Sequence, residues 1–335
     1  MKNQKKKVSI EDVAAQAGVS ITTVSRVINH FPTVTEDNRL KVEKVVAELG
    51  FRPNVSAQRL ARGHNNTMGL VMPGYPGIFY SFYAIELIRG VGHACESLKL
   101  DLIFHITDGH NPLNTSNVSG IIFADIINNR NQVESAIKEG IPAFVINHIA
   151  DDININYIGV DNHAGAKIAA EYLTGLGHKK IAMITGALST QSGLHRYEGF
   201  TEALKKKNID LPEEYVYKGD YSRRSARIAA EQFLSSKNRP TAIFASSDDM
   251  ALEVIAVIFE KGLKIPEDIS VIGFDDNPAA IYGSVSLTTI RQPLFKMAED
   301  SVRYLNAIVT GKSSSPVKIK LLPELVARES CSPPR

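Results

Sequence analysis

The sequence predicts an α/β protein in which a small all-α helix-turn-helix headpiece precedes a larger domain of doubly wound parallel sheets. Three observations lead to this prediction. The chain of 335 residues is too long for one simple core, so two or three domains are expected. Residues 9–29 have the polar caps, apolar spacing and turn glycine of two short helices. After residue 66, short apolar runs alternate with amphipathic stretches, as in βαβ units.

The headpiece begins with a helix that Ser9 can cap, and Asp12 can close the capping box. Gly18 tolerates the left-handed conformation needed to end that helix, and Ser20 can cap the next one. A third helix is expected over residues 35–49, before Gly50. Its expected apolar positions are Leu40, Val42, Val45, Val46 and Leu49.

The second helix, about residues 20–29, is interpreted as a recognition helix for the major groove of DNA. Arg26 can bind guanine O6 and N7, Ile21 can contact a thymine methyl, and Thr22 can make either polar or apolar contacts. Candidates for phosphate contacts are Thr23, Ser25 and Asn29. The alternative is a generic helical hairpin with a solvated polar face.

The charge of the chain is distributed unevenly. Residues 1–64 contain 11 Lys and Arg against 6 Asp and Glu, whereas the remainder contains 27 against 30. A basic N-terminal segment on a mildly acidic body indicates that this end binds a polyanion, although basic tails without that role are common.

Residues 53–65 are expected to form a hinge helix and linker. Pro53 forces a break, and the stretch 55–62 has helix formers without a wide apolar face, so a helix there would need a partner. Leu60, flanked by arginines, fits a wedge that enters the minor groove. Taken alone, this stretch is better explained as a flexible basic linker.

The larger domain is expected to place its ligand site beyond the carboxyl ends of the strands. Asp275 follows the apolar run SVIGF, Ser247 and Asp248 follow AIFAS, and Arg196 is expected to open the helix after the ITG strand. A carboxylate and a guanidinium commonly hold sugar hydroxyls. Either could instead form a salt bridge or cap a helix, and Asp248 could simply cap the helix over 249–261.

Aromatic residues precede and enter the first helix of this domain. Tyr75, Phe79, Tyr80 and Tyr83 could stack on a sugar face, with Tyr83 as the candidate effector contact, or they could pack in a loop or a dimer interface. The segment after Asp108 is short, so a helix there is expected to be reduced to a loop.

The composition excludes several classes of protein. No apolar run reaches the roughly 18 residues of a membrane helix, and no apolar segment follows the basic N-terminus as in a secretory signal. Two cysteines, Cys95 and Cys331, fit a reducing cytoplasm. Without a phosphate loop, a nucleophile elbow or a metal-ligand cluster, we expect neither an enzyme nor a cofactor or metal site.

Long runs of the sequence resemble the LacI/GalR family of bacterial transcription regulators. In the headpiece and hinge these runs are EDVAAQAGVSITTVSRVIN and LGFRPNVSAQRLARG. Further along they are MGLVMP, YIGVDNHAGAKIAAEYLTGLGHKKIAMITG, RYEGF, PTAIFASSDDMAL, IPEDISVIGFDD, LTTIRQP and LPELVARES. They cover nearly the whole chain in the family's order.

The resemblance implies a domain organisation. Residues 1–52 are the DNA-binding headpiece, 53–65 the hinge, and 66–335 an effector-binding and dimerisation domain with two periplasmic-binding-protein-like lobes. The first lobe is expected at about 66–159 and 291–321, and the second at about 160–290 and 322–335.

The resemblance also implies partners and contacts. Family members are homodimers or tetramers on palindromic double-stranded operator DNA, and a homodimer is expected here. Leu60 would insert at the operator centre with Ala57 beside it. The positions of Arg196 and Asp275 commonly contact the effector, whereas Ser247 stands where the family often has asparagine.

The predicted function is therefore a cytoplasmic, sequence-specific transcription repressor whose operator affinity is controlled by a small molecule, foremost a sugar or sugar derivative. Purines, nucleosides and a phosphorylated carrier protein acting as corepressor also occur as family ligands. The effector can either release DNA or promote its binding. The alternative is a sugar-binding protein without a DNA function, which the larger domain alone would fit.

Overall fold

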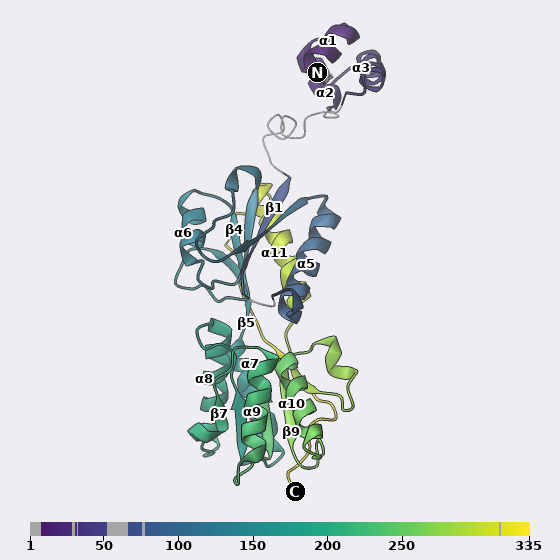
Figure 1. Cartoon of the computed structure of the whole chain (residues 1–335). Coiled ribbons are helices and arrows are strands. Elements are labelled where there is room, and N and C mark those ends of the chain that lie inside the picture. The colour runs from purple at the N-terminus through teal and green to yellow at the C-terminus, as the bar shows by residue number, and fades with distance from the viewer. Residues whose placement is uncertain (1–7, 29–30, 32, 52–65, 76–77, 315) are drawn as a thin grey trace, which may run out of the picture. The chain divides into compact units, whose positions relative to one another are not determined.

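The computed structural model describes residues 8–28, 31, 33–51, 66–75, 78–314 and 316–335. The chain divides into two compact units, Met1–Asn66 and Thr67–Arg335 (Figure 1). The predicted hinge at 53–65 lies outside the described residues, as do the candidate DNA contacts Asn29, Ala57 and Leu60.

The N-terminal unit contains the three helices α1 (Ile10–Ala17), α2 (Ile21–Ile28) and α3 (Glu36–Leu49). The capping box of α1 forms as predicted, because the backbone N–H of Ser9 donates to Asp12 Oδ2 (2.9 Å) and that of Asp12 donates to Ser9 Oγ (3.2 Å). Gly18 follows α1 in the left-handed conformation, with φ of 65°. The local sequence thus sets both ends of the first helix.

The three helices enclose a small core of valine and alanine side chains. Its buried members are Val13, Ala14, Val24, Val27, Val42 and Val45. Leu40, an expected apolar position of α3, is instead 58% exposed. At 3.6 residues per turn it lies about 160° around the helix axis from Val42, so it points away from α1 and α2.

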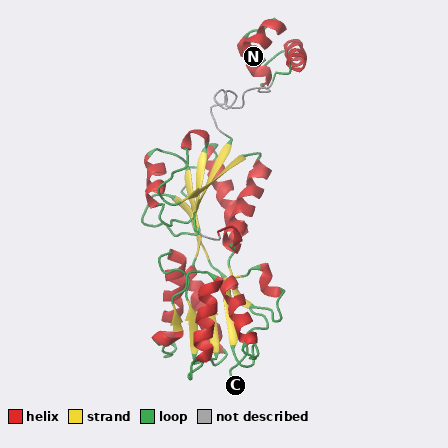
Figure 2. Ribbon diagram, viewed as in Figure 1, coloured by secondary structure: helices red, strands yellow, loops and turns green. Residues whose placement is uncertain are grey.

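The C-terminal unit is built on two six-stranded sheets (Figures 1 and 2). The first has the order β11-β5-β4-β3-β1-β2, and all its neighbouring strands are parallel. Its strands are β1 (Thr67–Pro73), β2 (Asp101–Thr107), β3 (Gly120–Ala124), β4 (Ala143–Ile146), β5 (Asn156–Val160) and β11 (Lys318–Leu321).

The second sheet has the order β12-β10-β9-β8-β6-β7, and only the pair β10–β12 is antiparallel. Its strands are β6 (Ile181–Ile184), β7 (Val216–Tyr217), β8 (Ala242–Ala245), β9 (Ser270–Asp275), β10 (Thr288–Arg291) and β12 (Glu324–Val326). Two parallel-rich sheets confirm the predicted doubly wound, two-lobed architecture.

Helices cover both faces of each sheet. In the first lobe, α5 (Phe82–Leu98) and α11 (Leu294–Val309) pack on one face and α6 (Arg130–Lys138) on the other. In the second lobe, the helices are α7 (Asn162–Gly175), α8 (Gln191–Lys206), α9 (Arg223–Ser235) and α10 (Asp248–Glu260). Helices α9 and α10 share one apolar cluster, whereas α7 and α8 share another.

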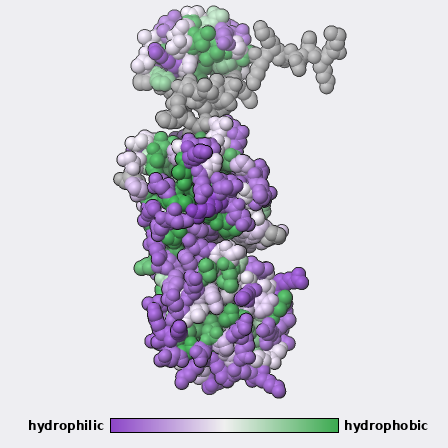
Figure 3. All heavy atoms as spheres, turned by 90° about the vertical axis from the view of Figure 1, so that its left-hand side faces the viewer, coloured by the Kyte–Doolittle hydropathy of each residue, from purple (hydrophilic) through white to green (hydrophobic). Residues whose placement is uncertain are grey.

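The chain crosses between the lobes at three places: after β5, after β10 and after β11. Short 3-10 turns complete the elements, namely η1 (Ile78–Tyr80), η2 (Thr115–Asn117), η3 (Glu213–Tyr215) and η4 (Pro278–Ile281). On the face of the larger unit in Figure 3, hydrophilic residues predominate and apolar residues form separate patches. Among the described helices, none is long and apolar enough to span a membrane.

The segment between β2 and β3 contains only the turn η2, where a helix would normally cross back over the sheet. The loop is fixed by hydrogen bonds from the side chains of His105 and Thr107 to the carbonyl of Asn111. A Leu113 methyl group lies 2.5 Å from the point where a Cβ on Gly69 would stand. One leucine side chain therefore covers part of the sheet in place of a helix.

Alanine substitution at two glycines of α5 should change the free energy of unfolding in opposite directions. A Cβ at Gly90 would lie 2.3 Å from the carbonyl oxygen of Phe295 in α11, whereas a Cβ at Gly92 would meet nothing within 4 Å. We expect Gly90→Ala to lower the free energy of unfolding by about 1–3 kcal/mol through overpacking. Gly92→Ala should raise it by about 0.5–1 kcal/mol through helix propensity. Chemical denaturation checks both, and equal effects would contradict the close approach of α5 and α11.

Candidate functional site

Helix α2 presents one polar face and buries the other. Val24 and Val27 lie in the headpiece core, whereas Ile21, Thr22 and Arg26 are exposed. Ile21 is 48% exposed, which leaves an aliphatic group accessible for contact. The three predicted base-reading residues thus lie on the accessible side of the predicted recognition helix.

The start of α2 is set by Ser20. Its Oγ accepts a hydrogen bond from the backbone N–H of Thr23 (3.1 Å) and lies 2.9 Å from Thr23 Oγ1. Thr23 and Ser25 are half-buried, so they lie nearer the core of the headpiece than Ile21, Thr22 and Arg26 do. The first turn of α2 has no acidic residue, in contrast to α1 and α3. An anion can therefore approach this helix N-terminus without repulsion from its first turn.

In the larger unit, the structure brings Arg196 and Asp275 together at the carboxyl ends of strands. Arg196 is almost fully buried, and its Nη1 lies 3.8 Å from Asp275 Oδ1. Its Nε donates to Asn162 Oδ1 (2.8 Å), its Nη1 donates to the carbonyl of Ser246, and its guanidinium lies 3.6 Å from the centre of the Phe274 ring. A buried guanidinium held on several sides is rigid, which suits it to orient a polar ligand.

The position of Arg196 within its helix differs from the prediction. Helix α8 begins at Gln191, because Thr190 Oγ1 accepts from the backbone N–H of Gly193 (3.1 Å) and caps the helix. Arg196 therefore lies in the second turn, where it points into the lobe, and does not open the helix. Sequence reasoning missed the cap at Thr190.

Asp275 is the last residue of β9 and has φ of 126°, which non-glycine residues seldom adopt. Its Oδ1 accepts a hydrogen bond from Gln292 Nε2 (2.5 Å). Burial raises the pKa of Asp275 to about 7, although Arg196 and Gln292 act to lower it. This carboxyl can therefore accept or donate a hydrogen bond near neutral pH.

The structure gives Ser247 and Asp248 contacts within the protein. Ser247 Oγ caps α10 by accepting from the backbone N–H of Met250 (3.3 Å). Asp248 is fully buried, and its two oxygens accept from the backbone N–H of Asn277 (2.7 Å) and the hydroxyl of Thr289 (2.6 Å). These bonds hold the loop after Asp275 in place. Both carboxylate oxygens of Asp248 are thus engaged within the protein, which favours a structural role over direct contact with a ligand.

The four aromatic residues before and within α5 separate into two groups. Tyr75, Phe79 and Tyr80 are 41%, 57% and 89% exposed, and the Phe79 ring lies 6.1 Å from that of Phe104. Tyr83 is different, because its hydroxyl is buried and makes no hydrogen bond within 3.5 Å among the described residues, although the nearby side chain of Asn147 acts to lower its pKa. Burial raises the pKa of Tyr83, and the nearby carboxylate of Asp125 raises it further.

Asp125 and Asn147 are further residues at this end of the first sheet, and the sequence reasoning missed both. They directly follow β3 and β4, and both have positive φ, 78° and 64° respectively. Both are buried, and Asn147 Nδ2 lies 3.5 Å from Asp125 Oδ2. The signal that could have found them is their place immediately after the apolar runs GIIFA and AFVI.

Several buried polar atoms near these residues lack hydrogen-bond partners within the described part of the chain. They are Tyr83 Oη, Asn147 Oδ1, Ser246 Oγ and Gln292 Oε1. Buried polar atoms are normally paired, so such a group is what a polar ligand would satisfy. Ser246 and Gln292 contact the Arg196–Asp275 pair directly.

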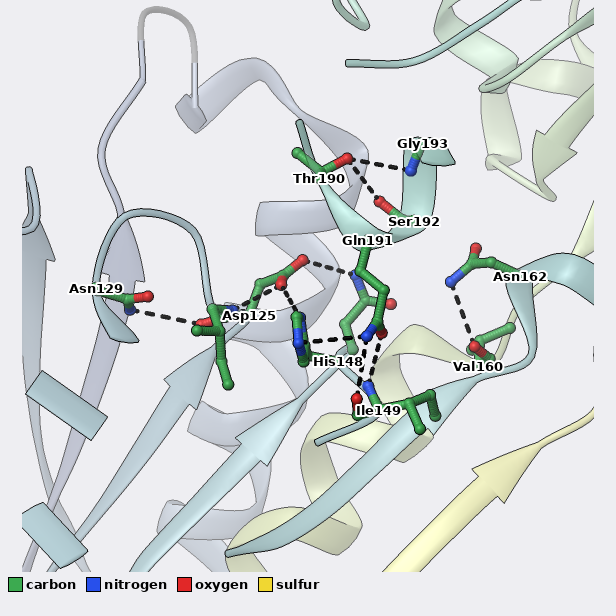
Figure 4. Close-up of polar contacts among 12 residues, drawn as sticks. Asp125, Asn129, His148, Ile149, Val160, Asn162, Thr190, Gln191, Ser192 and Gly193 are labelled. Atoms are coloured by element: carbon green, nitrogen blue, oxygen red, sulfur yellow. Dashed lines mark hydrogen bonds and ion pairs between the residues drawn. The ribbon is translucent and has the colours of Figure 1, made fainter. Parts of the chain in front are cut away.

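The two lobes meet near these residues. Burial raises the pKa of Asp249 at the start of α10, whereas the nearby backbone N–H of Phe82 at the start of α5 acts to lower it. Gln191 of α8 makes two hydrogen bonds to the backbone of Ile149 in the first lobe (Figure 4). The candidate site thus draws residues from both lobes.

His178 and the two cysteines of the larger unit are at least partly buried. His178 Nδ1 lies 2.9 Å from Thr241 Oγ1 and its Nε2 lies 2.9 Å from the carbonyl oxygen of Ser332; burial lowers its pKa. Burial raises the pKa of the Cys95 thiol to about 11 and that of Cys331 to about 12, so both stay protonated at neutral pH. No cluster of metal-ligating side chains occurs among the described residues.

The raised pKa of Asp275 predicts a pH dependence of stability. A carboxyl group that is harder to ionise in the folded state stabilises it most below pH 3.8, and this stabilisation is lost as the pH rises to about 7. The difference in unfolding free energy between wild type and Asp275→Asn should therefore decrease over that interval. Chemical denaturation at a series of pH values measures it, with the exposed Asp210→Asn as control. A difference independent of pH would contradict the assignment.

Comparisons with known proteins match both units of the chain. Residues 9–54 match the family described as bacterial regulatory proteins, lacI family, and residues 170–331 match a periplasmic binding protein-like domain. The chain is 34% identical to the HTH-type transcriptional regulator DegA of Bacillus subtilis (strain 168), over 98% of this chain and 99% of that protein.

Two similar solved structures carry ligands. The lac repressor dimer bound to operator and the anti-inducer ONPF has a TM-score of 0.85 and 29% identity, over 98% of this chain and 100% of that one. The complex of the transcriptional regulator CelR with cellobiose has a TM-score of 0.72 and 28% identity, over 96% of this chain and 99% of that one. The chain therefore belongs to the LacI family of bacterial regulatory proteins.

Proposed function

We propose that this protein is a transcription repressor that binds operator DNA through α2 and releases or retains it according to a small polyhydroxylated effector, a sugar or sugar derivative. The observation that supports the effector most directly is the buried Arg196–Asp275 pair beside polar atoms without partners. An effector that binds one arrangement of the lobes more tightly than another changes DNA affinity by linkage.

The exposed face of α2 fits direct readout of the major groove. The guanidinium of Arg26 can bind guanine O6 and N7 as a bidentate donor, and Ile21 can contact a thymine methyl. Thr22 adds a contact of either kind. Thr23, Ser25 and Asn29 stay candidates for phosphate contacts, and Ala57 and Leu60 stay candidates for the minor groove at the operator centre.

Each chain has one predicted recognition helix, so a homodimer would present two of them. The twofold symmetry of such a dimer matches the twofold symmetry of a palindromic operator. The lac repressor, similar in structure, binds its operator as a dimer. Contacts to phosphate would make the affinity fall steeply with salt concentration.

A carbohydrate suits the polar groups of the effector site. The carboxyl of Asp275 can accept from or donate to a ligand hydroxyl, and the Tyr83 hydroxyl, Asn147 and Gln292 provide further bonds. Arg196 is stacked on Phe274 and cannot move far to follow a ligand. That CelR has been solved with cellobiose supports a sugar as the first class to test.

Replacing Arg26 should relax the choice of DNA sequence. We expect Arg26→Ala to lower the ratio of operator to random-DNA affinity about tenfold to a hundredfold, because each bidentate base contact discriminates by about 1–3 kcal/mol. An operator selected from a random duplex library and a titration at fixed salt measure this ratio. Lys41→Ala, which removes a positive charge paired with Asp37 on α3, is the matched control and should leave the ratio unchanged.

An unchanged ratio in Arg26→Ala would show that α2 does not read the bases. A full-length protein that prefers no duplex over random DNA, with or without sugars, would contradict the repressor function as a whole.

Replacing Tyr83 should separate effector binding from stability. Tyr83→Phe removes a buried hydroxyl that makes no hydrogen bond within 3.5 Å among the described residues, so the melting temperature of the free protein should stay the same or rise. Affinity for the effector should fall about threefold to tenfold through the loss of one hydrogen bond. A thermal-shift screen of sugars identifies the ligand, and calorimetry measures its affinity. The exposed Tyr80→Phe should change neither quantity, and unaltered effector affinity in Tyr83→Phe would remove Tyr83 from the site.

A further inference from the structure

Gln191 joins the two lobes through every polar atom of its side chain. Its Oε1 accepts from the backbone N–H of Ile149 (2.8 Å), and its Nε2 donates to the carbonyl of Ile149 (3.0 Å). The same Nε2 lies 3.3 Å from His148 Nε2. Gln191 is the first residue of α8 in the second lobe, whereas His148 and Ile149 follow β4 in the first lobe (Figure 4).

His148 is itself held by the carboxylate of Asp125. His148 Nδ1 lies 3.0 Å from Asp125 Oδ1, and an ionised carboxylate only accepts hydrogen bonds. The hydrogen-bond network therefore assigns the proton to Nδ1 and leaves Nε2 to accept from Gln191. Asp125 is fixed in turn, because it is buried and its Oδ1 accepts from the backbone N–H of Ile126 (2.6 Å).

We propose that Gln191 positions the second lobe against the first, through a clamp formed with Ile149, His148 and Asp125. The role rests on the proposed function, since a positioned pair of lobes matters when a ligand binds residues of both. Gln191 and Arg196 belong to the same helix, so fixing the start of α8 also fixes where Arg196 stands relative to the first lobe.

The clamp and the effector residues share Asp125. This carboxylate raises the pKa of Tyr83, and within the described part of the chain its second oxygen makes only the 3.5 Å contact with Asn147 Nδ2. A ligand hydroxyl that bonds to Tyr83 or Asn147 therefore meets the carboxylate that holds His148. Ligand binding and lobe position are coupled in this way through one side chain.

The backbone amide of Ile149 reports the clamp directly, because it donates to Gln191 across the lobes. The amide of Asn147 provides an internal control, since it donates to the carbonyl of Ile158 (2.8 Å) within the first lobe. Hydrogen exchange of the full-length protein, resolved to single amides, compares the two. The measurement needs neither operator nor effector.

Gln191→Met keeps the length of the side chain and removes its hydrogen bonds. We expect it to accelerate exchange at Ile149 at least about tenfold, since two hydrogen bonds are lost, and to leave Asn147 within about twofold of wild type. Gln191→Glu retains an acceptor for the Ile149 N–H and should restore part of the protection. Gln232→Met, an exposed position on α9, should alter neither amide.

Two results would overturn the proposal. Unchanged exchange at Ile149 in Gln191→Met would mean that the clamp does not form in solution. Faster exchange at both Ile149 and Asn147 would mean that Gln191 supports the fold of the first lobe and not the position of the second. Operator binding by wild type is tested separately, so failure of the repressor function would not be mistaken for failure of the clamp.

Discussion

A guanidinium buried in the second lobe is the constraint on which the proposed effector site depends. A charged group removed from water must be paired and hydrogen-bonded on most sides. Arg196 meets this requirement with Asn162 at the start of α7, the carbonyl of Ser246 after β8, and Asp275 at the end of β9. One side chain thereby fixes the relative positions of a helix start and two strand ends.

The surrounding network keeps that arrangement rigid. Asp248 holds the loop after β9 through Asn277 and β10 through Thr289, and a Cβ on Gly273 would lie 2.1 Å from its Oδ1. Burial raises the pKa values of Asp248 and Asp275, and repulsion from neighbouring carboxylates raises them further. A ligand that offers hydroxyl groups relieves this repulsion, whereas a ligand with its own negative charge would add to it.

Sequence reasoning predicted the fold class and most strands, because apolar runs of four to seven residues between amphipathic stretches leave few alternatives. It located Arg196 and Asp275 as a pair, since both follow strand runs. It misplaced the start of α8 because Thr190 is a cap that only the turn geometry distinguishes from a loop threonine. It counted Leu40 with the apolar positions of α3, but apolar character alone does not say toward which side a helical residue points, and Leu40 is exposed.

The contacts between the lobes could not be predicted from the sequence, since Gln191 and Ile149 are 42 residues apart and belong to different lobes.

The position of Leu113 over Gly69 limits which side chain residue 69 can carry. A Cβ at position 69 would lie 2.5 Å from the Leu113 methyl group, so alanine there would require that flexible side chain to turn away. Glycine at position 69 thus allows the loop between β2 and β3 to pack directly on the sheet through Leu113.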